Sequence, residues 1–456
     1  MENENATNEY RVTNTLFYHD DLAHCTRCPV PHFFTFPTNP ICPHLLIIEL
    51  FLLELLLMMS RATVFESNKL ISKAAKVREK TIASSPRHEP LVENEDYLTR
   101  QIITYIGNKR SLLEFIAKGI HVVQKKLQRD KLSIFDVFSG SGIVSRYFKR
   151  YAETLLVNDL ESYTKVINEC YLANASEIDF EKLNNIYRRL VASISARPLE
   201  AGIITELYAP KDDDDIQPGE RVFYTRRNAM YIDTMRKLIE SVDAEYQKFF
   251  LAPLLAEASV HSNTSGVFKG FHKNRTTGIG QFGGSNQDAL LRIKGEIELP
   301  MPILSNYDCR TIIYNGDSNE IIKTAPKVDL AYLDPPYNQH PYGSNYFMLN
   351  LILENKFPES MSKISGIPEN WNRSLYNKRQ FAYEALTNLV ENIKAKFVLI
   401  SFNSEGFIPL DAMKSMLQKV GNVHVLEINY NTFRGCRNLS NRDIHVTEYL
   451  YLLEKS

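Results

Sequence analysis

The segment 132–148 narrows the possible folds more than any other part of this chain. An apolar run of strand length, Leu132 to Phe138, leads directly into the glycine-rich turn Ser139–Gly142. Apolar residues then recur at helical spacing, at Ile143, Val144, Tyr147 and Phe148. Glycines in such a turn let the backbone approach a ligand closely, and the start of the following helix offers unpaired N–H groups. The pattern therefore predicts an α/β unit with a ligand-binding turn, although F-x-G-x-G alone does not identify the ligand.

Three further apolar runs of strand length each lead to an acidic residue. Residues 154–157 precede Asp159, residues 311–315 precede Asp317, and residues 328–333 precede Asp334. In an open α/β sheet, ligands bind outside the carboxyl ends of the strands. We therefore predict a doubly wound, Rossmann-like α/β sheet in which the glycine turn and these acids converge on one site.

The acid after the second run has two interpretations. Asp159 lies 17 residues after Gly142, where nucleoside-binding sheets place an acid that binds ribose hydroxyls. Glu161 competes for this role. Alternatively, Asp159 caps the helix expected over residues 162–171, and the two roles are compatible.

Asp334-Pro335-Pro336-Tyr337 is the most specific motif in the chain. Proline fixes φ, lacks an N–H and favours an extended predecessor, so two prolines form a rigid bracket. We expect the Asp334 carboxylate and the Pro335 carbonyl to be neighbouring acceptors beside the Tyr337 ring, which suits a planar base that carries an amino group. The alternative is a buried turn with a hydrogen-bonded acid. The following stretch, 339–346, is expected to be a mobile lid or a DNA contact.

Together these motifs resemble the Dam-like class of N6-adenine-specific DNA methyltransferases, particularly its restriction–modification members. The residues that resemble its S-adenosylmethionine motif are Phe138, Gly140 and Gly142, and those that resemble its catalytic motif are Asp334, Pro335, Pro336 and Tyr337. Residues 105–109 resemble the family's first segment, with Asn108 where a second glycine is common. From that segment, Tyr105 and Lys109 carry over as cofactor-binding positions.

The resemblance extends to two acids and covers residues 100–453. Asp159 matches the family's ribose-binding acid, and Asp317 matches the acid that receives the adenine amino group of the cofactor. The implied reaction is transfer of a methyl group from S-adenosylmethionine to N6 of adenine in double-stranded DNA, with the target base flipped out of the duplex. No metal is required, a cognate restriction endonuclease is a candidate partner, and the expected location is the cytoplasm.

Two rival functions stay open from the sequence. One is amino methylation of another substrate, either RNA adenine or protein glutamine, because the Pro-Pro bracket can present acceptors to any planar amine. The other is a nucleic-acid-binding module that keeps the fold without catalysis. Intact Gly140, Gly142, Asp334, Pro335 and Tyr337 argue against that module.

The long stretch between the cofactor motifs and the catalytic motif supplies the expected DNA-binding surface. We predict a mainly helical target-recognition insertion at 176–300, within a catalytic domain formed by 96–175 and 301–456. Residues 261–295 hold five bases against one acid, together with seven of the 19 glycines. Lys269, Lys273 and Arg275 are the candidate DNA contacts there, and a solvated basic loop is the alternative. The glycine-rich stretch 278–284 is interpreted as a flexible loop.

An antiparallel pair of strands is expected to close the sheet at the carboxyl end of the chain. Residues 423–430 and 446–453 are typical of strands. The loop between them contains Arg434 and Arg437, which are candidate contacts with DNA or with the target base. A plain hairpin turn is equally compatible with that loop.

The net charge of the chain limits where a nucleic-acid-binding surface can lie. Lys+Arg 53 against Asp+Glu 54 gives a formal net charge of −1, so any nucleic-acid surface must be local. Residues 1–95 are predicted to be an extension of unknown role, partly disordered. Its apolar run 45–59 is short and contains two glutamates, which favours a buried or partner-binding helix over stable membrane association. Its zinc pattern is weak and consists of Cys25, Cys28, Cys42 and His44.

Overall fold

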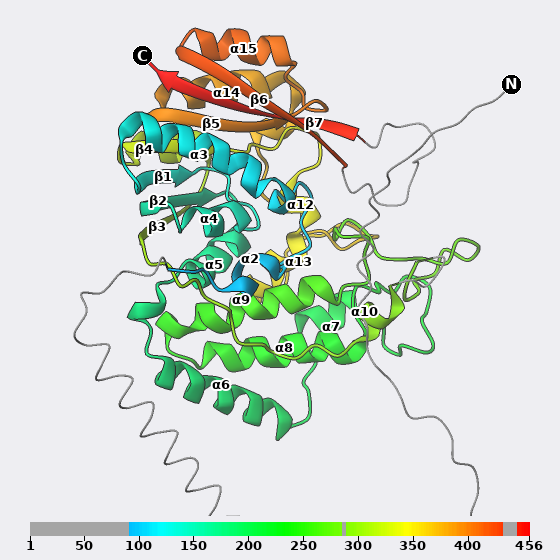
Figure 1. Cartoon of the computed structure of the whole chain (residues 1–456). Coiled ribbons are helices and arrows are strands. Elements are labelled where there is room, and N and C mark those ends of the chain that lie inside the picture. The colour runs from blue at the N-terminus through cyan, green and yellow to red at the C-terminus, as the bar shows by residue number, and fades with distance from the viewer. Residues whose placement is uncertain (1–90, 285–288, 432–444) are drawn as a thin grey trace, which may run out of the picture. The chain divides into compact units, whose positions relative to one another are not determined.

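A seven-stranded mixed sheet forms the centre of the catalytic part (Figure 1). The computed structural model describes residues 91–284, 289–431 and 445–456. The strands run in the order β3-β2-β1-β4-β5-β7-β6. Neighbours from β3 to β5 are parallel, whereas β7 lies antiparallel to both β5 and β6. The strand bounds are β1 Leu132–Asp136, β2 Ala152–Asp159, β3 Arg310–Asn315, β4 Val328–Leu333, β5 Ala395–Asn403, β6 Gly421–Asn431 and β7 His445–Lys455.

The central strands are buried on both faces. In β4, Leu330 and Tyr332 belong to one apolar core, while Ala331 and Leu333 belong to the core on the other face. This alternation follows from the two-residue period of a strand. Parallel strands that are covered on both faces have nearly continuous apolar sequences, which is why these strands were detectable from the sequence.

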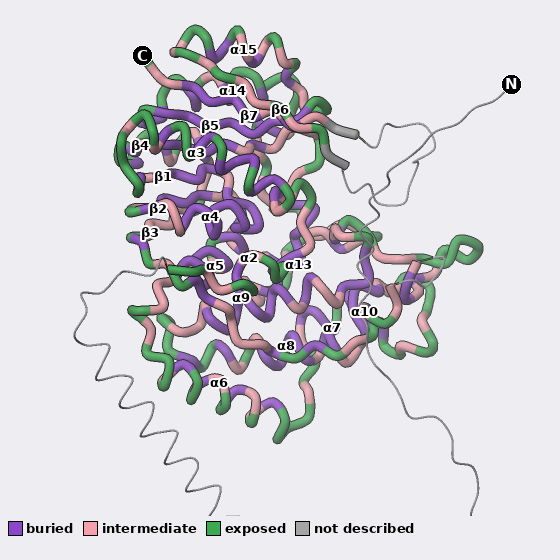
Figure 2. Tube along the Cα trace, viewed as in Figure 1, coloured by how far each residue is buried: buried purple, intermediate pink, exposed green. Residues whose placement is uncertain are grey.

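Helices cover both faces of the sheet. One layer contains α3 (Leu113–Leu127) and α4 (Ile143–Phe148), and the other contains α11 (Ser318–Thr324), α14 (Arg379–Asn392) and α15 (Leu410–Gln418). Figure 2 shows the strands largely buried and the outer surface of α15 exposed. The predicted doubly wound α/β fold and its antiparallel end are confirmed.

A third apolar core joins the β3 side of the sheet to a group of helices inserted between β2 and β3. α5 (Ser162–Tyr171) follows β2, and the inserted helices are α6 (Phe180–Ser195), α7 (Ile203–Tyr208), α8 (Arg226–Glu240), α9 (Ala244–Val260) and α10 (Leu290–Lys294). Figure 1 shows α6, α8 and α9 beyond the β3 edge. Their core also includes α2 (Glu95–Thr99), α5 and α13 (Phe347–Glu354). The insertion is mainly helical, and its limits at 176 and 300 stay a prediction.

The remaining short elements connect these layers. They are η1 (Arg110–Leu112), η2 (Ala175–Glu177), α12 (Tyr342–Asn345) and η3 (Leu375–Asn377). Within the described ranges, no helix is both long and apolar enough to cross a membrane. The apolar run 45–59 and the candidate zinc ligands Cys25, Cys28, Cys42 and His44 lie outside the described residues.

The end of the predicted extension contacts the segment that precedes β3. The Glu93 carboxylate accepts hydrogen bonds from the Ser305 hydroxyl (2.7 Å) and from the Asn306 N–H (2.8 Å). The Asn306 side chain in turn donates to the Val92 carbonyl (2.9 Å). Residues 92 and 93 are therefore tied to the part of the chain that was predicted to be catalytic.

Candidate active site

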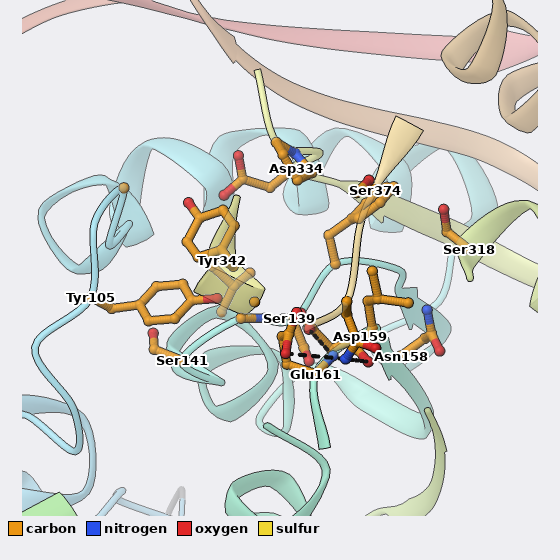
Figure 3. Close-up of a pocket in the computed structure, with 18 of the residues that line it drawn as sticks. Tyr105, Ser139, Ser141, Asn158, Asp159, Glu161, Ser318, Asp334, Tyr342 and Ser374 are labelled. Atoms are coloured by element: carbon orange, nitrogen blue, oxygen red, sulfur yellow. Dashed lines mark hydrogen bonds between the residues drawn. The ribbon is translucent and has the colours of Figure 1, made fainter. Parts of the chain in front are cut away.

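A cavity lies at the carboxyl ends of β1, β2, β3 and β4 (Figure 3). The chain runs outward from β1 to β3 and then crosses to β4 on the other side of β1. Such a reversal of strand order is where open α/β sheets bind ligands.

Most of the predicted cofactor-binding and catalytic residues meet at this cavity. Those that line it are Tyr105, Lys109, Phe138, Gly140, Asp159, Asp317, Asp334 and Pro336. Among the described residues, the predicted Gly142, Pro335 and Tyr337 are not part of the lining. The glycine turn, the acids and the proline bracket thus converge on one cavity, as the expected sheet topology predicted.

Two glycines with positive φ shape the turn between β1 and α4. Gly140 has φ +51° and Gly142 has φ +77°. A Cβ atom on Gly140 would lie 2.8 Å from Cε1 of Tyr105, and one on Gly142 would lie 2.8 Å from Oδ1 of Asn168. Both separations are too short for van der Waals contact, so the turn requires glycine for its space as well as for its backbone conformation.

Asp159 braces this turn from the end of β2. Its carboxylate accepts hydrogen bonds from the Gly140 N–H (2.8 Å) and from the Glu161 N–H (3.0 Å). The alternative prediction that Asp159 caps α5 is wrong, because Asp159 is still the last residue of the strand. Glu161 occupies the N-cap position instead, and its side chain makes no capping hydrogen bond.

Glu161 is a buried acid that also lines the cavity. Its carboxylate, in a residue that is 2% exposed, accepts hydrogen bonds from the side-chain amides of Asn350 (2.7 Å) and Asn372 (3.2 Å). Burial and then the neighbouring charge of Asp159 raise the pKa of Glu161 to about 7. Burial also raises the pKa of Asp159. Ionisable groups with perturbed pKa values in a cavity are typical of functional sites.

Asp317 and Phe138 reach the cavity from two other strand ends. The Asp317 carboxylate caps α11 by accepting a hydrogen bond from the Asn319 N–H (2.9 Å). The Phe138 ring packs edge to face on Tyr376, with 5.1 Å between the centroids. Both predicted residues are therefore held by local contacts while they line the cavity.

The Asp-Pro-Pro-Tyr motif begins directly after β4. Burial raises the pKa of Asp334 to about 6, and the positive charge of Lys109 opposes this shift. The Tyr337 ring packs against Phe402 with 5.9 Å between the centroids. The Tyr337 carbonyl accepts a hydrogen bond from the Phe407 N–H (3.0 Å). These contacts hold the motif between β4 and the segment that ends and follows β5.

Lys109 links the first segment to the catalytic motif. Its Nζ atom lies 3.1 Å from Oδ1 of Asp334 and 3.3 Å from Oε1 of Glu448. The same atom lies 5.5 Å from the centroid of the Tyr337 ring. Burial lowers the pKa of Lys109, but the two carboxylates outweigh burial and raise that pKa well above its usual value. The ammonium group therefore stays protonated between two acids.

Stacked tyrosines fix the first segment against the chain that follows the catalytic motif. The Tyr105 ring lies 4.9 Å from Tyr342 and 4.8 Å from Tyr346, centroid to centroid. The Tyr342 hydroxyl donates to the Ile106 carbonyl (3.0 Å), and the Ile106 N–H donates to the Tyr346 hydroxyl (2.7 Å). Part of the predicted mobile lid therefore forms α12 and packs on the first segment. Figure 3 shows Tyr342 close to Asp334.

Tyr342 and Glu448 also lie at this site, although the sequence predicted no specific role for either of them. Tyr342 carried no detectable signal, because its partners come from a distant segment. Glu448 did carry a signal in the sequence, because it lies on the same face of the expected strand as Leu450 and Leu452. In the structure it is only 1% exposed. A carboxylate in an inward-facing apolar row is unusual and marks a position with a specific partner.

The predicted DNA-binding residues of the insertion are exposed. Lys269, Lys273 and Arg275 all lie on the surface, and the ammonium of Lys273 sits 5.0 Å from the centroid of the Phe271 ring. Burial and then the positive charge of Lys269 lower the pKa of His340, which follows the catalytic motif. Arg434 and Arg437 lie outside the described residues.

The glycine-rich stretch 278–284 was interpreted as a flexible loop, but residues 280–283 of it are held by packing and hydrogen bonds, whereas Gly278 is exposed. The Asn263 amide donates to the carbonyls of Val222 (2.7 Å) and Gln281 (2.9 Å) and accepts a hydrogen bond from the Gly283 N–H (3.0 Å). A Cβ atom on Gly280 would lie 2.4 Å from the Val222 side chain. Glycine here permits close packing rather than flexibility.

Fold and site together define a Rossmann-like α/β transferase in which a glycine turn and an Asp-Pro-Pro-Tyr motif share one cavity. The sequence matches the D12 class N6 adenine-specific DNA methyltransferase family over residues 105–416. This chain belongs to that family. It is an adenine-specific DNA methyltransferase, as the resemblance of its motifs implied, and its reaction needs a methyl donor.

Two similar methyltransferases align with this chain over nearly their whole length. The type II methyltransferase M.NlaIII of Neisseria lactamica is 28% identical over 364 residues, which are 78% of this chain and 100% of that protein. The type II methyltransferase M.CviAII of Paramecium bursaria Chlorella virus 1 is 29% identical over 77% of this chain and 98% of its own. A solved structure from Thermoplasma acidophilum aligns with 77% of this chain and 98% of its own at a TM-score of 0.26 and 8% identity, too low a similarity to inform function.

Proposed function

We propose that this chain is the modification enzyme of a restriction–modification system and transfers a methyl group from S-adenosylmethionine to N6 of adenine within a specific site in double-stranded DNA. The observation that carries the proposal is the shared cavity, which brings Asp334 and Pro336 next to the glycine turn and the acids of β2 and β3. A restriction endonuclease of the same specificity is the expected partner. An enzyme with this substrate works beside the DNA, in the cytoplasm.

The cavity fits a nucleoside-containing cofactor. Gly140 lets the Tyr105 ring lie directly against the glycine turn, where a Cβ atom would collide with that ring, and the acids Asp159, Glu161 and Asp317 line the walls. Carboxylates at strand ends suit ribose hydroxyls and an adenine amino group. We assign Asp159, with Glu161 beside it, to the ribose and Asp317 to the adenine amino group. The other residues that we assign to the cofactor site, where they shape its walls, are Tyr105, Lys109, Phe138, Gly140 and Gly142. When bound, S-adenosylmethionine supplies an activated methyl group.

The Asp-Pro-Pro-Tyr motif suits the amine of the target base. The lone pair of an exocyclic adenine amine is delocalised into the ring, which makes it a poor nucleophile. We assign the Asp334 carboxylate and the Pro335 carbonyl as acceptors of its two N–H bonds, so that the lone pair points toward the methyl group. Tyr337 stacks on the base, and Pro336 keeps the bracket rigid. The base reaches this site only after it leaves the duplex.

Methyl transfer to unmethylated duplex DNA is the direct test. We expect N6-methyladenine when the protein is incubated with labelled S-adenosylmethionine and plasmid DNA from a methylation-deficient host, with the product identified by nucleoside analysis. Sequencing that detects the modified base would then show one specific site. Transfer to RNA or to protein glutamine in place of DNA would contradict the substrate, and cofactor binding without any transfer would contradict the enzyme.

The basic surface of the insertion is continuous with a loop of the catalytic part. The carbonyl of Lys269 accepts a hydrogen bond from the Ser365 hydroxyl (2.6 Å), and the Tyr208 hydroxyl donates to the Gly366 carbonyl (2.6 Å). The exposed Lys363 lies in the same turn. We propose that this combined surface contacts the DNA backbone and that residues 176–300 form the target-recognition domain, within a catalytic domain of 96–175 and 301–456.

Substitution of the exposed bases is expected to weaken DNA binding in a salt-dependent way. For Lys273→Ala and Arg275→Ala, the slope of log K against log salt should fall by about 0.9 for each lost phosphate contact. Binding is measured by fluorescence anisotropy over a range of salt concentrations. Lys125→Ala, which removes an exposed lysine from α3, is the matched control and should leave the slope unchanged. Equal slopes for all four proteins would place the DNA elsewhere.

A further inference from the structure

A buried cluster of three charges lies at the catalytic end of the sheet. Lys109 pairs with Asp334 at 3.1 Å and with Glu448 at 3.3 Å. The side chains of Lys109 and Glu448 are 3% and 1% exposed, whereas that of Asp334 is 17% exposed. Lys109 and Asp334 both line the cavity. Asp334 is therefore the carboxylate of the cluster that a ligand in the cavity can reach, and Glu448 is the carboxylate held behind Lys109.

The position of Glu448 is set by the antiparallel end of the sheet. In β7 it pairs with Asn403 of β5 and with Ile428 of β6. The Ser401 hydroxyl, also on β5, donates a hydrogen bond to its Oε1 atom. The carboxylate is thus brought to the carboxyl edge of the parallel strands by a strand that runs in the opposite direction.

Stability does not explain a carboxylate at this position. The next residues on the same face of β7 are Leu450 and Leu452, and both are buried in the apolar core. A buried ion pair is often no more stabilising than apolar residues of similar volume, because taking charges out of water is costly. The charge of Glu448 therefore calls for an explanation in terms of its neighbours Lys109 and Asp334.

The charge balance of the cluster supplies that explanation. Lys109 and Asp334 alone would form a neutral pair, in which the ammonium cancels the carboxylate that faces the cavity. With Glu448 on the other side of Lys109, two negative charges share one positive charge, and the cluster has a net charge of −1. The ion pair with Lys109 uses Oδ1 of Asp334. The other carboxylate oxygen, Oδ2, can then accept a hydrogen bond from an amine N–H.

We propose that Glu448 is a positioning residue for methyl transfer, which holds the Lys109 ammonium so that Asp334 faces the target amine within a cluster of net negative charge. This inference rests on the proposed function in one respect, namely that the adenine amine lies against Asp334. As the C–N bond forms at N6, the S–CH3 bond of the sulfonium would break with its electron pair left on sulfur. Positive charge would develop on N6 until that nitrogen loses a proton along its hydrogen bond to the Asp334 carboxylate. A net negative charge beside it stabilises this change, whereas an unshared Lys109 would oppose it.

The pH dependence of the reaction distinguishes this role from a purely structural one. The groups that face Asp334 are Lys109, Glu448, Tyr332, Tyr337, Tyr342 and Asp136. Of these, Lys109 lowers the pKa of Asp334, and Glu448 raises it. An ionised Asp334 is needed as an acceptor, so the rate falls as the pH drops through its pKa. Loss of the Glu448 charge should therefore move this acidic limb to lower pH.

The test is Glu448→Gln, which has the same shape without the charge. Single-turnover rates are measured with a duplex that carries the methylation site, from neutral to mildly acidic pH. We expect the plateau rate to fall by about tenfold and the acidic limb to shift to lower pH, with unchanged affinities for S-adenosylmethionine and DNA. The matched control is Glu454→Gln on the same strand, whose partner Lys126 lies at the surface, and it should behave as wild type.

A double-mutant cycle shows whether Glu448 acts through Lys109. In a Lys109→Met background, Glu448→Gln should produce little further loss, because the group that it holds is gone. Glu448→Asp places the charge farther from Lys109 and should give an intermediate rate and an intermediate limb shift. It serves as the test where Glu448→Gln does not fold.

The outcomes separate this inference from the proposed function. A wild-type rate and pH profile for Glu448→Gln would overturn the inference, as would an equal fall in both backgrounds of the cycle. Wild-type behaviour of Glu448→Asp would overturn it where the glutamine variant does not fold. A wild-type protein that transfers no methyl group to adenine would instead overturn the proposed function.

Discussion

Asp334→Asn is expected to lower the single-turnover rate of methyl transfer by about 10³-fold, with little change in the affinity for S-adenosylmethionine. The amide keeps the shape of the carboxylate, but it removes the negative charge and turns one acceptor into a donor that opposes the adenine amine. Lys109 would still be held by Glu448 at 3.3 Å, so the fold around the motif should survive. Rapid-quench measurement of labelled methyl transfer gives the rate, and titration calorimetry gives the affinity.

The control for this substitution is Glu153→Gln. Glu153 is an acid on β2 whose side chain is 48% exposed and pairs with Arg129 at 2.6 Å, and it is not part of the cavity lining. Its removal changes the net charge by the same amount, and we expect a rate equal to that of wild type. A rate for Asp334→Asn that also equals that of wild type would exclude Asp334 as the acceptor of the amine.

Gly140→Ala is expected to weaken binding of S-adenosylmethionine by about 100-fold. The alanine must adopt a positive φ, and its Cβ atom would lie 2.8 Å from the Tyr105 ring. That ring is stacked against Tyr342 and Tyr346 and has little room to move. The turn would therefore shift, and the hydrogen bond from the Gly140 N–H to Asp159 (2.8 Å) would be disturbed. Titration calorimetry with the cofactor measures the effect.

Gly219→Ala separates backbone strain from the steric effect. Gly219 also has a positive φ, +92°, but no atom in the described ranges comes within 4 Å of the position of its Cβ. We expect a small loss of stability, about 1–2 kcal/mol from the left-handed conformation, and unchanged cofactor affinity. Equal cofactor affinities for the alanine variants at 140 and 219 would show that the β1–α4 turn does not shape the cofactor site.

The sheet was predictable because its strands are buried on both faces. Residues such as Ile134, Leu155 and Leu330 are fully buried, and a strand covered by helices on both sides has an apolar sequence of recognisable length. The proline bracket was equally clear, since it depends on backbone restrictions that act between adjacent residues. Both kinds of signal are local in the chain.

The detailed roles of the acids were less predictable. Sequence position places Asp159 and Glu161 within two residues of each other, and it cannot distinguish their side-chain directions. In the structure, Asp159 bonds to the glycine turn, whereas Glu161 bonds to Asn350 and Asn372 from the chain after the catalytic motif. The contacts of the glycine-rich stretch 278–284 were missed for a similar reason, because the packing of Gly280 against Val222 depends on a neighbour that the local sequence does not reveal.

The sequence by itself determined the strands, the glycine turn, the Asp-Pro-Pro-Tyr bracket and the convergence of the acids at one edge of the sheet, because burial periodicity and backbone restrictions are properties of short segments. Only the tertiary structure decided that Glu448 reaches Lys109 and that Tyr105 stacks on both Tyr342 and Tyr346. Those contacts join segments that are far apart in the chain. They depend on strand order and register, which place β7 antiparallel between β5 and β6.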